Sequence, residues 1–307
     1  MTDTTAATPS RFARRATRHW RERLIEFGLF LAAASSVATT VAIVVILVRE
    51  SAGFFAQVSI KEFLTDTQWT PLFSDAHYGI LPLVSGTLVT SFVALLLAVP
   101  IGTIIAIYLS EFASHRVREI VKPALELLAG VPTVVFGYFA LLMVTPFLQR
   151  FMPDLPGFNM LGPGIVIGIM IIPYVSSVSE DAMRAVPDYM REGSYAMGAT
   201  RLQTALRVVM PAATSGIIAA YILGISRAVG ETMVVAVAAG QQPNFTWNPM
   251  EAAATITTFI VQVSLGDLPH GTIAYQSIFA AGLVLMLMTL SFNVAGHLVR
   301  KRFREVY

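Results

Sequence analysis

The sequence predicts an all-α integral membrane protein with six transmembrane helices. Of its 307 residues, 55% are hydrophobic and only 13% are charged, whereas a soluble domain carries roughly 25% charged residues. Long apolar runs recur along the chain, and about 20 apolar residues are enough for a helix to cross a membrane. Basic residues gather in alternate connections between these runs, which is typical of multi-pass membrane proteins.

The first apolar run, residues 27–48, is uncharged over 22 residues. A helix of this length crosses the roughly 30 Å of bilayer hydrocarbon. The arginines before it also suit a secretory signal peptide, but the apolar core of a signal peptide has only about 7–15 residues. We therefore interpret this run as the first span. Residues 1–23 are then a cytoplasmic tail, and its first ten residues are polar and expected to be disordered.

Five further apolar blocks follow, each bounded by charges, prolines or polar clusters: residues 80–109, 124–148, 163–178, 212–240 and 272–298. Pro100, Pro132 and Pro173 lie within the second, third and fourth spans and predict kinks there. Together with the first run, these blocks predict a single membrane domain over residues 24–307 and no separate soluble domain.

The basic residues predict the orientation of the spans. Seventeen of the 21 lie in the N-terminal tail, in the connections after the second and fourth spans, and in the C-terminal tail. Arg49, Lys61 and Arg150 lie on the other side, and Arg227 lies inside the fifth span. Because cytoplasmic loops carry an excess of lysine and arginine, both termini are predicted to be cytoplasmic. The net charge of +2 is thus a topology signal and not a nucleic-acid footprint, although the N-terminal arginines could contact anionic lipid.

The two long connections on the opposite side carry aromatic residues. Trp69, Phe73 and Tyr78 in the first of them suit the membrane–water interface, and a short amphipathic segment is predicted near residues 61–64. The second, after residue 240, either dips into the membrane or meets an external partner.

Several classes of function are excluded or disfavoured. The chain has no cysteine, and its five histidines are scattered without a ligand spacing, so neither disulfides nor a metal site is predicted. No nucleophile–base pair points to an enzyme. No Gly-Lys dipeptide occurs, so the chain has no phosphate-binding P-loop and binds no cofactor of its own. If ATP supplies energy, a separate polypeptide must hydrolyse it.

The connection over residues 184–211 predicts two short helices joined by a glycine turn. The first starts at Pro187 and ends at Gly198, and Thr200 with Gln203 has the form of a capping box that opens the second. Apolar residues share one face of each helix: Tyr189, Met190, Gly193, Ala196 and Met197 in the first, and Leu202, Ala205, Leu206, Val209 and Met210 in the second. Helices this short need a partner, which is either the bilayer surface or another protein.

The spacing of this hairpin resembles the EAA loop of permease subunits in ABC importers. Glu192 is followed by Gly198, Val208, Met210 and Pro211 at the spacing of that motif, while Gly193 and Ser194 stand where the motif has two alanines. The resemblance implies the six-helix bundle of type I (MetI-like) importers. It also implies that the hairpin docks into a separate ATP-hydrolysing subunit. The docking residues would be Glu192, Ala196, Met197, Gly198, Leu202 and Pro211.

The fifth span contains two charged residues, Arg227 and Glu231. A central arginine costs about 2.5–3.5 kcal/mol on membrane-insertion scales and by default marks a functional site. Because the two residues are four apart, we expect them to stack on one helix face within salt-bridge reach. One interpretation is a purely structural ion pair, with Gly224 and Gly230 allowing close helix packing. The other is an oxyanion site, in which the guanidinium binds phosphate-like oxygens and Thr232 adds a hydroxyl.

The sequence RAVGETM, starting at Arg227, resembles a run in the C-type permease of the phosphate-specific (Pst) ABC transporter. Residues 79–113 and 125–141 resemble the second and third spans of that subunit, and the similarity covers about residues 79–304. The resemblance implies import of inorganic phosphate across a bacterial inner membrane, with Arg227 and Glu231 required for transport. The implied partners are a homologous A-type permease, two ATP-binding cassette subunits that hold ATP and Mg, and an extracytoplasmic phosphate-binding protein.

Four questions stay open on the residues alone: the oxyanion, the type of permease, the energy source and the role of Glu126. Arginine binds sulfate, molybdate or phosphonate as well as phosphate, and the sister A-type permease has a similar arginine–glutamate run. An ion-coupled secondary transporter could use Arg227 and Glu231 as a relay. Glu126, near the cytoplasmic end of the third span, either pairs with Lys122 or reaches the interface, or else forms a gate or substrate contact with the kink at Pro132.

Overall fold

The computed structural model describes residues 16–71, 73, 75–266, 269 and 271–302. Most of the predicted N-terminal tail, including Arg11, Arg14 and Arg15, and Arg304 of the C-terminal tail lie outside them. The chain divides into two units, residues 1–49 and 50–307, and each is described by itself. Apart from the isolated β-bridge between Trp69 and Tyr78, the regular structure of the described residues is helical.

Fourteen α-helices and three π-helical segments (η) are described. In chain order they are α1 Ala16–Phe55, α2 Ile60–Thr65, α3 Leu81–Ile107, η1 Tyr108–Phe112, α4 His115–Ala129, α5 Thr133–Phe139, η2 Ala140–Val144, α6 Thr145–Gln149, α7 Leu161–Arg184, α8 Asp188–Ala196, α9 Arg201–Thr204, η3 Ala205–Val209, α10 Met210–Ala212, α11 Thr214–Val229, α12 Met233–Ala238, α13 Ile256–Ser264 and α14 Ile273–Arg302.

Four of the predicted spans are confirmed as single helical stretches. The segments 22–55, 81–112, 161–184 and 273–302 are long and apolar enough to cross a membrane, and the count reaches six if each of two bent helix pairs is one span. In the first unit, residues 16–49 form one uninterrupted helical stretch within α1. Residues 27–48 of this stretch are uncharged, largely apolar and mostly exposed, as expected of a helix that faces lipid.

The third and fifth spans, predicted over residues 124–148 and 212–240, are interrupted helices. The axis turns by 86° between α4 and the stretch Thr133–Gln149, at a break where Pro132 caps α5 with an extended backbone. The kink predicted at Pro132 is therefore confirmed. A second bend of 75° separates the stretch Arg201–Ala212 from α11, and α11 already ends at Val229. By contrast, α3 and α7 continue through Pro100 and Pro173.

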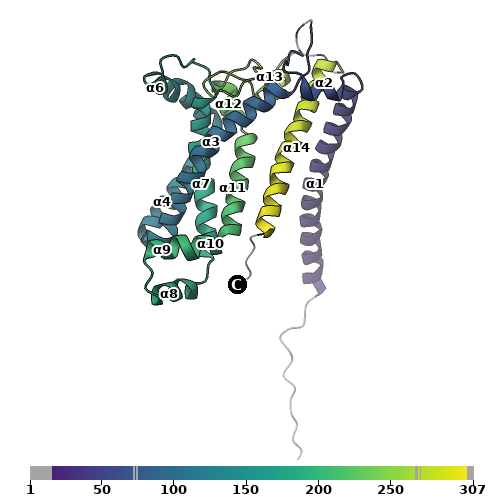
Figure 1. Ribbon diagram of the computed structural model, residues 1–307. Coiled ribbons are helices and arrows are strands. Elements are labelled where there is room, and N and C mark those ends of the chain that lie inside the picture. The colour runs from purple at the N-terminus through teal and green to yellow at the C-terminus, as the bar shows by residue number, and fades with distance from the viewer. Residues whose placement is uncertain (1–15, 72, 74, 267–268, 270, 303–307) are drawn as a thin grey trace, which may run out of the picture. The chain divides into compact units, whose positions relative to one another are not determined.

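The centre of the second unit is a bundle in which α3, α7 and α11 pack along one another (Figure 1). Small residues set the spacing of these helices, because a Cβ at Gly168 of α7 would lie 2.8 Å from the Ala94 carbonyl oxygen of α3. A Cβ at Gly224 of α11 would lie 3.2 Å from the Val175 side chain, so the close packing expected there is confirmed. Membrane helices rely on such contacts, since lipid is as apolar as their own side chains. Gly230 instead ends α11 and makes no close helix contact.

An aromatic cluster lies at the end of the bundle that carries α2 and α13 (Figure 1). Trp69 is 2% exposed, and its ring packs edge-to-face against Phe63, Tyr78 and Phe259. Trp69 therefore packs against protein, because this connection folds back onto the bundle, and its position at the membrane–water interface stays a prediction. The short amphipathic segment predicted near residues 61–64 is confirmed as α2.

Candidate functional site

Arg227 occupies the last turn of α11, and its guanidinium lies over an aromatic ring. Its guanidinium carbon lies 4.6 Å from the centroid of the Tyr174 ring on α7. The Nε atom is buried and has no hydrogen-bond partner in the described part of the chain. An aromatic face attracts a cation through its quadrupole, and the attraction strengthens away from water. Tyr174 thus stabilises a charge that would otherwise stand alone in the bundle.

Glu231 lies beyond the end of that helix. Gly230 has φ −90° and ψ 1° and terminates α11. The Glu231 side chain is only 7% exposed, and its Oε1 accepts from the backbone nitrogens of Met233 at 3.2 Å and Val234 at 3.4 Å. The carboxylate therefore caps the first turn of α12, where unpaired N–H groups favour a negative charge.

The predicted stacking of Arg227 and Glu231 on one helix face is wrong. It assumed a continuous helix, whereas the break at residues 230–232 turns the carboxylate toward α12, and no ion pair joins the two side chains among the described residues. A buried hydroxyl holds the break in place, since Thr257 Oγ1 on α13 donates to the Glu231 carbonyl oxygen at 2.8 Å. Thr232 is part of the same break, and its Oγ1 donates to the Gly230 carbonyl oxygen at 3.3 Å.

The ring of Tyr174 also touches the break in the third span. Its hydroxyl lies 3.5 Å from the carbonyl oxygen of Ala129, the last residue of α4. Arg227, Tyr174 and the 86° bend after α4 are thus linked through one side chain.

The predicted hairpin is confirmed in its local structure. The first helix, α8, ends at Ala196 and is followed by Gly198 with φ 82°, a left-handed conformation that glycine adopts without strain. Both hydrogen bonds of the Thr200–Gln203 capping box are present at the start of α9. The Ser194 and Thr204 hydroxyls lie 2.9 Å apart and join the two helices. Pro187 precedes α8 as its N-cap, and the 75° bend shifts the start of the fifth span from residue 212, where it was predicted, to Thr214.

The two faces of the hairpin have different environments. Val209 and Ala205 are buried, and Val209 joins an apolar cluster with Met183 of α7 and Ala106 of α3. The predicted docking residues are all exposed, Met197 to 89%; they are Glu192, Ala196, Met197, Gly198, Leu202 and Pro211. The single apolar face predicted for the second helix is thus divided between a buried and an exposed half.

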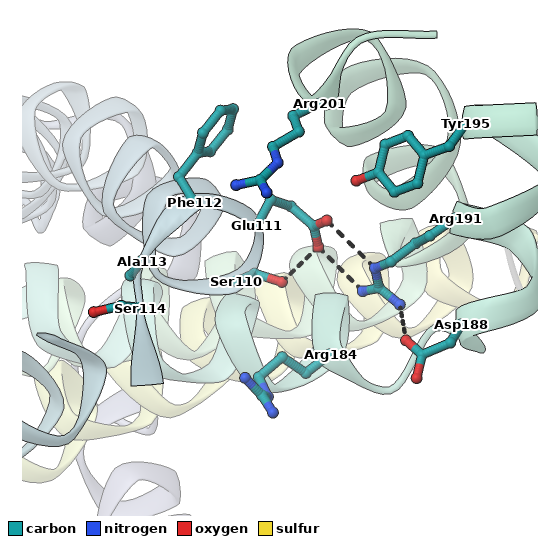
Figure 2. Close-up of a pocket in the computed structure, with 10 residues that line it drawn as sticks. All are labelled: Ser110, Glu111, Phe112, Ala113, Ser114, Arg184, Asp188, Arg191, Tyr195 and Arg201. Carbon is teal, nitrogen blue, oxygen red and sulfur yellow. Dashed lines mark hydrogen bonds and ion pairs between the residues drawn. The ribbon is translucent and has the colours of Figure 1, made fainter. Parts of the chain in front are cut away.

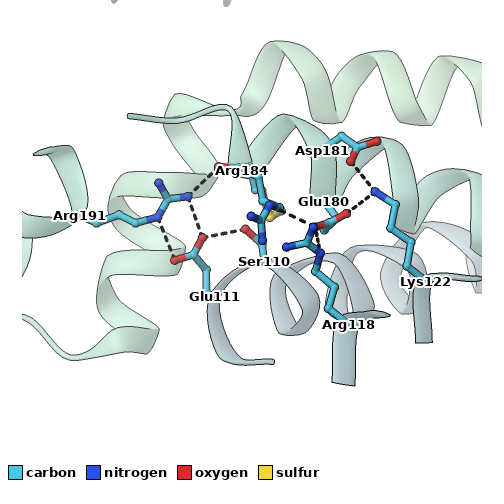
Figure 3. A network of polar contacts seen from close by, with 9 residues as sticks. Ser110, Glu111, Arg118, Lys122, Glu180, Asp181, Arg184 and Arg191 are labelled. Carbon is cyan, nitrogen blue, oxygen red and sulfur yellow. Dashed lines mark hydrogen bonds and ion pairs between the residues drawn. The ribbon is translucent and has the colours of Figure 1, made fainter. Parts of the chain in front are cut away.

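Sequence reasoning missed a network of buried charges at the base of this hairpin (Figure 3). Glu180 of α7 is fully buried, and its carboxylate lies 2.8 Å from Lys122 Nζ, 3.3 Å from Arg118 Nε and 3.7 Å from Arg184 Nε. Glu111, in the π-helical segment η1, pairs with Arg191 of α8 at 3.1 Å. In the sequence, the basic residues indicated only the orientation of the spans. Their pairing with Glu180 and Glu111 could not be predicted, because most of these partners lie far apart in the chain.

The predicted pairing of Glu126 with Lys122 is wrong. The Lys122 ammonium donates to Glu180 and Asp181 of α7, which offer it two carboxylates. Glu126 is exposed on α4 and lines a surface hollow together with Gly130 and Pro132. A gate or substrate role for Glu126 stays a prediction.

Comparison with known proteins adds family context to this geometry. Residues 98–305 match the family model described as "Binding-protein-dependent transport system inner membrane component". The chain is 37% identical to a probable ABC transporter permease protein, YqgH, of Bacillus subtilis, over 83% of each chain. It is 34% identical to the phosphate transport system permease protein PstC 1 of Mycobacterium tuberculosis, over 76% of this chain and 80% of that one.

Solved structures show the same fold at lower sequence identity. A bacterial ABC transporter involved in the import of the acidic polysaccharide alginate has a chain that is 16% identical, with a TM-score of 0.64, over 94% of this chain and all of that one. The methionine ABC transporter MetNI in an inward-facing form has a TM-score of 0.55 at 18% identity, over 74% of this chain and 95% of that one.

Proposed function

Because the chain belongs to the family of binding-protein-dependent transport system inner membrane components, we propose that it is the permease subunit of an ATP-driven importer of inorganic phosphate. The single observation that carries the proposal is Arg227, a cation inside the helix bundle whose contact is an aromatic ring and not a carboxylate. The relatives named as phosphate transport permeases support phosphate as the anion.

Phosphate would bind Arg227 where the side chain now lies over Tyr174. A guanidinium donates in a planar fork that matches two phosphate oxygens. Moving from the ring to the anion would let the unpaired Nε gain a charge-assisted hydrogen bond. Phosphate entry would thus complete the hydrogen bonding of Arg227 without breaking a salt bridge.

The helix break at Gly230–Thr232 fits this role. Irregular backbone at membrane depth is tolerated where protein buries it or where it lines a polar path, and transporters place substrate sites at such breaks. In our proposal Glu231 forms no ion pair with Arg227 when phosphate is absent. It holds α12 in place and so shapes the end of α11 that carries the arginine.

Other subunits complete the transporter. We propose that the exposed side chains of the hairpin, among them Tyr189, Met197 and Leu202, dock into one ATP-binding cassette subunit, and that the hairpin of the homologous permease docks into a second. These two subunits would hold ATP and Mg. A homologous permease would close the phosphate path, and an extracytoplasmic phosphate-binding protein would deliver the anion. Both termini would be cytoplasmic, on the side of the hairpin, and annular lipid would cover the outer faces of the spans.

Uptake by the reconstituted complex tests the proposal. Purified wild-type complex in proteoliposomes should take up radiolabelled phosphate with ATP and the binding protein present, and vanadate should stop it. Arg227→Ala should lower uptake about 10–100-fold, since a hydrogen bond to a charged group contributes about 1.5–3 kcal/mol and 1.4 kcal/mol corresponds to tenfold. Arg150→Ala, at an exposed arginine after α6, is the matched control.

Two outcomes would contradict the proposal. Stronger competition by unlabelled sulfate, molybdate or phosphonate than by phosphate would show a different oxyanion. Uptake driven by an ion gradient and insensitive to vanadate would show a secondary transporter.

A further inference from the structure

We infer that Arg191 is a positioning residue that fastens the hairpin helix α8 to the ends of the second and fourth spans, so that ATPase movement reaches both spans together. The inference rests on the proposed function, because it assigns a part in its energy coupling. It concerns the inner base of the hairpin and not the exposed face that would dock.

Arg191 binds two different elements with one guanidinium, and Figure 2 shows its contact with one of them, through Glu111. Its Nε lies 3.3 Å from Glu111 Oε2 and its Nη2 lies 3.1 Å from Glu111 Oε1, which is a two-pronged contact with the segment η1 that ends the second span. Its Nη2 also donates to the Met183 carbonyl oxygen at 2.8 Å, and its Nη1 donates to the Val186 carbonyl oxygen at 2.6 Å. These carbonyls belong to the last turn of α7 and the link that follows it.

The ion pair between Arg191 and Glu111 is largely buried. The Arg191 side chain is 14% exposed and that of Glu111 is 4% exposed, so water screens their attraction weakly. Asp188 also accepts from Arg191, at 3.3 Å, but its side chain is 89% exposed and this contact contributes little. Arg184 and Arg201 line the same pocket, and neither forms an ion pair with Glu111 among the described residues.

The rest of the hairpin is attached differently. The second helical stretch, α9 to α10, continues along the chain into α11 and so into the fifth span. The first helix, α8, packs on α9 and η3, while its own covalent link to α7 is the short segment Ala185–Pro187. The Arg191 side chain therefore supplies the polar connection from α8 to the second and fourth spans.

The connection needs arginine. Only a planar guanidinium donates at once to both carboxylate oxygens and to two carbonyls in fixed directions, whereas a lysine ammonium is a point charge with three rotatable donors. Glu111 is oriented by a further hydrogen bond from Ser110 Oγ at 2.8 Å. Glu111→Gln keeps the shape of the acceptor and removes its charge.

Transport and ATP hydrolysis, measured together, test the inference. The complete complex is reconstituted with Arg191→Lys, with Glu111→Gln, and with both. We expect each variant to retain the ATPase subunits and their hydrolysis, while substrate moved per ATP falls about tenfold because charge-assisted hydrogen bonds that fix one geometry are lost. The double variant should be no worse than either single one, since both break the same contact.

The matched controls are Arg116→Lys and Glu119→Gln, two exposed residues of α4 with no contact to the hairpin, which should keep the wild-type ratio. Three outcomes would overturn the inference: Arg191→Lys with a wild-type ratio, additive effects in the double variant, or loss of the ATPase subunits from either variant, which would indicate a docking role. Failure of the proposed function is separate, because it appears as a wild-type complex that does not carry phosphate.

Discussion

The guanidinium carbon of Arg227 lies 4.6 Å from the centre of the Tyr174 ring, although the two residues belong to different helices, α11 and α7. The charge of the fifth span is thus stabilised by a neutral side chain. A neutral partner leaves the hydrogen-bonding capacity of the arginine available for an anion, which a carboxylate partner would not.

Removal of the Tyr174 ring should destabilise the empty complex more than the phosphate-loaded one. A cation–π contact is worth about 0.5–2 kcal/mol, and bound phosphate would replace it. Tyr174→Leu should therefore lower the thermal midpoint of the purified complex more without phosphate than with saturating phosphate. Tyr174→Phe keeps the ring and serves as the control. Equal shifts in the presence and absence of phosphate would show that Tyr174 only fills space.

Substitution of Glu231 tests whether its carboxylate acts as a helix cap or as part of an ion pair. The amide oxygen of Glu231→Gln still accepts from the Met233 and Val234 nitrogens, whereas Glu231→Ala leaves both unpaired. Loss of a helix cap costs about 0.5–2 kcal/mol, and charge-assisted bonds are about twice as strong as neutral ones. We expect Glu231→Gln to lose about half as much stability as Glu231→Ala, measured by thermal unfolding. If glutamine and alanine were equally damaging, the charge itself would be the required feature.

Glu180 should matter more to stability than an exposed carboxylate. Glu180→Gln removes the anion that Arg118, Lys122 and Arg184 share, and this should lower the free energy of unfolding by about 1.5–3 kcal/mol. Because the three basic residues are partly exposed, we expect the lower end of that range. Glu119→Gln should change the thermal midpoint little, because in the described part of the chain its carboxylate pairs only with the exposed His115 in the preceding turn. A shift no larger than that of the control would exclude a stabilising role for this network.

The connection after α2 should loosen as the pH rises. The hydrogen bond with Asp66, at 3.0 Å, raises the pKa of His77 above its ordinary value of 6.5. The stabilisation by the protonated imidazole is therefore fully present below pH 6.5 and is lost as the pH rises through the raised pKa. Amide hydrogen exchange at residues 66–71, corrected for its intrinsic pH dependence, should accelerate as the pH rises above 6.5. Asp66→Asn should weaken this pH effect, leaving only the smaller contribution of Asp75 at 3.6 Å from His77 Nε2. Asp154→Asn, in an exposed loop, should leave it unchanged.

Much of the fold could be predicted because the signals are local. Apolar run length defined four spans, the alternation of arginines suggested an orientation, and Thr200 with Gln203 and Gly198 placed both ends of the hairpin turn. The same logic failed at Gly230. Gly230 ends α11 earlier than predicted. Only the hydrogen bonds of Glu231 show that its carboxylate binds the backbone of α12 and not Arg227.

By itself, the sequence determined the membrane class, the hairpin and the presence of a charge in the fifth span, because these depend on residues close together in the chain. Only the tertiary structure decided the partners: Tyr174 for Arg227, Glu180 for Lys122 and Glu111 for Arg191. The physical reason is that each buried charge is stabilised by a group on another helix. Helix packing and the two bends bring those groups together, and of these only the bend at Pro132 had a signal in the local sequence.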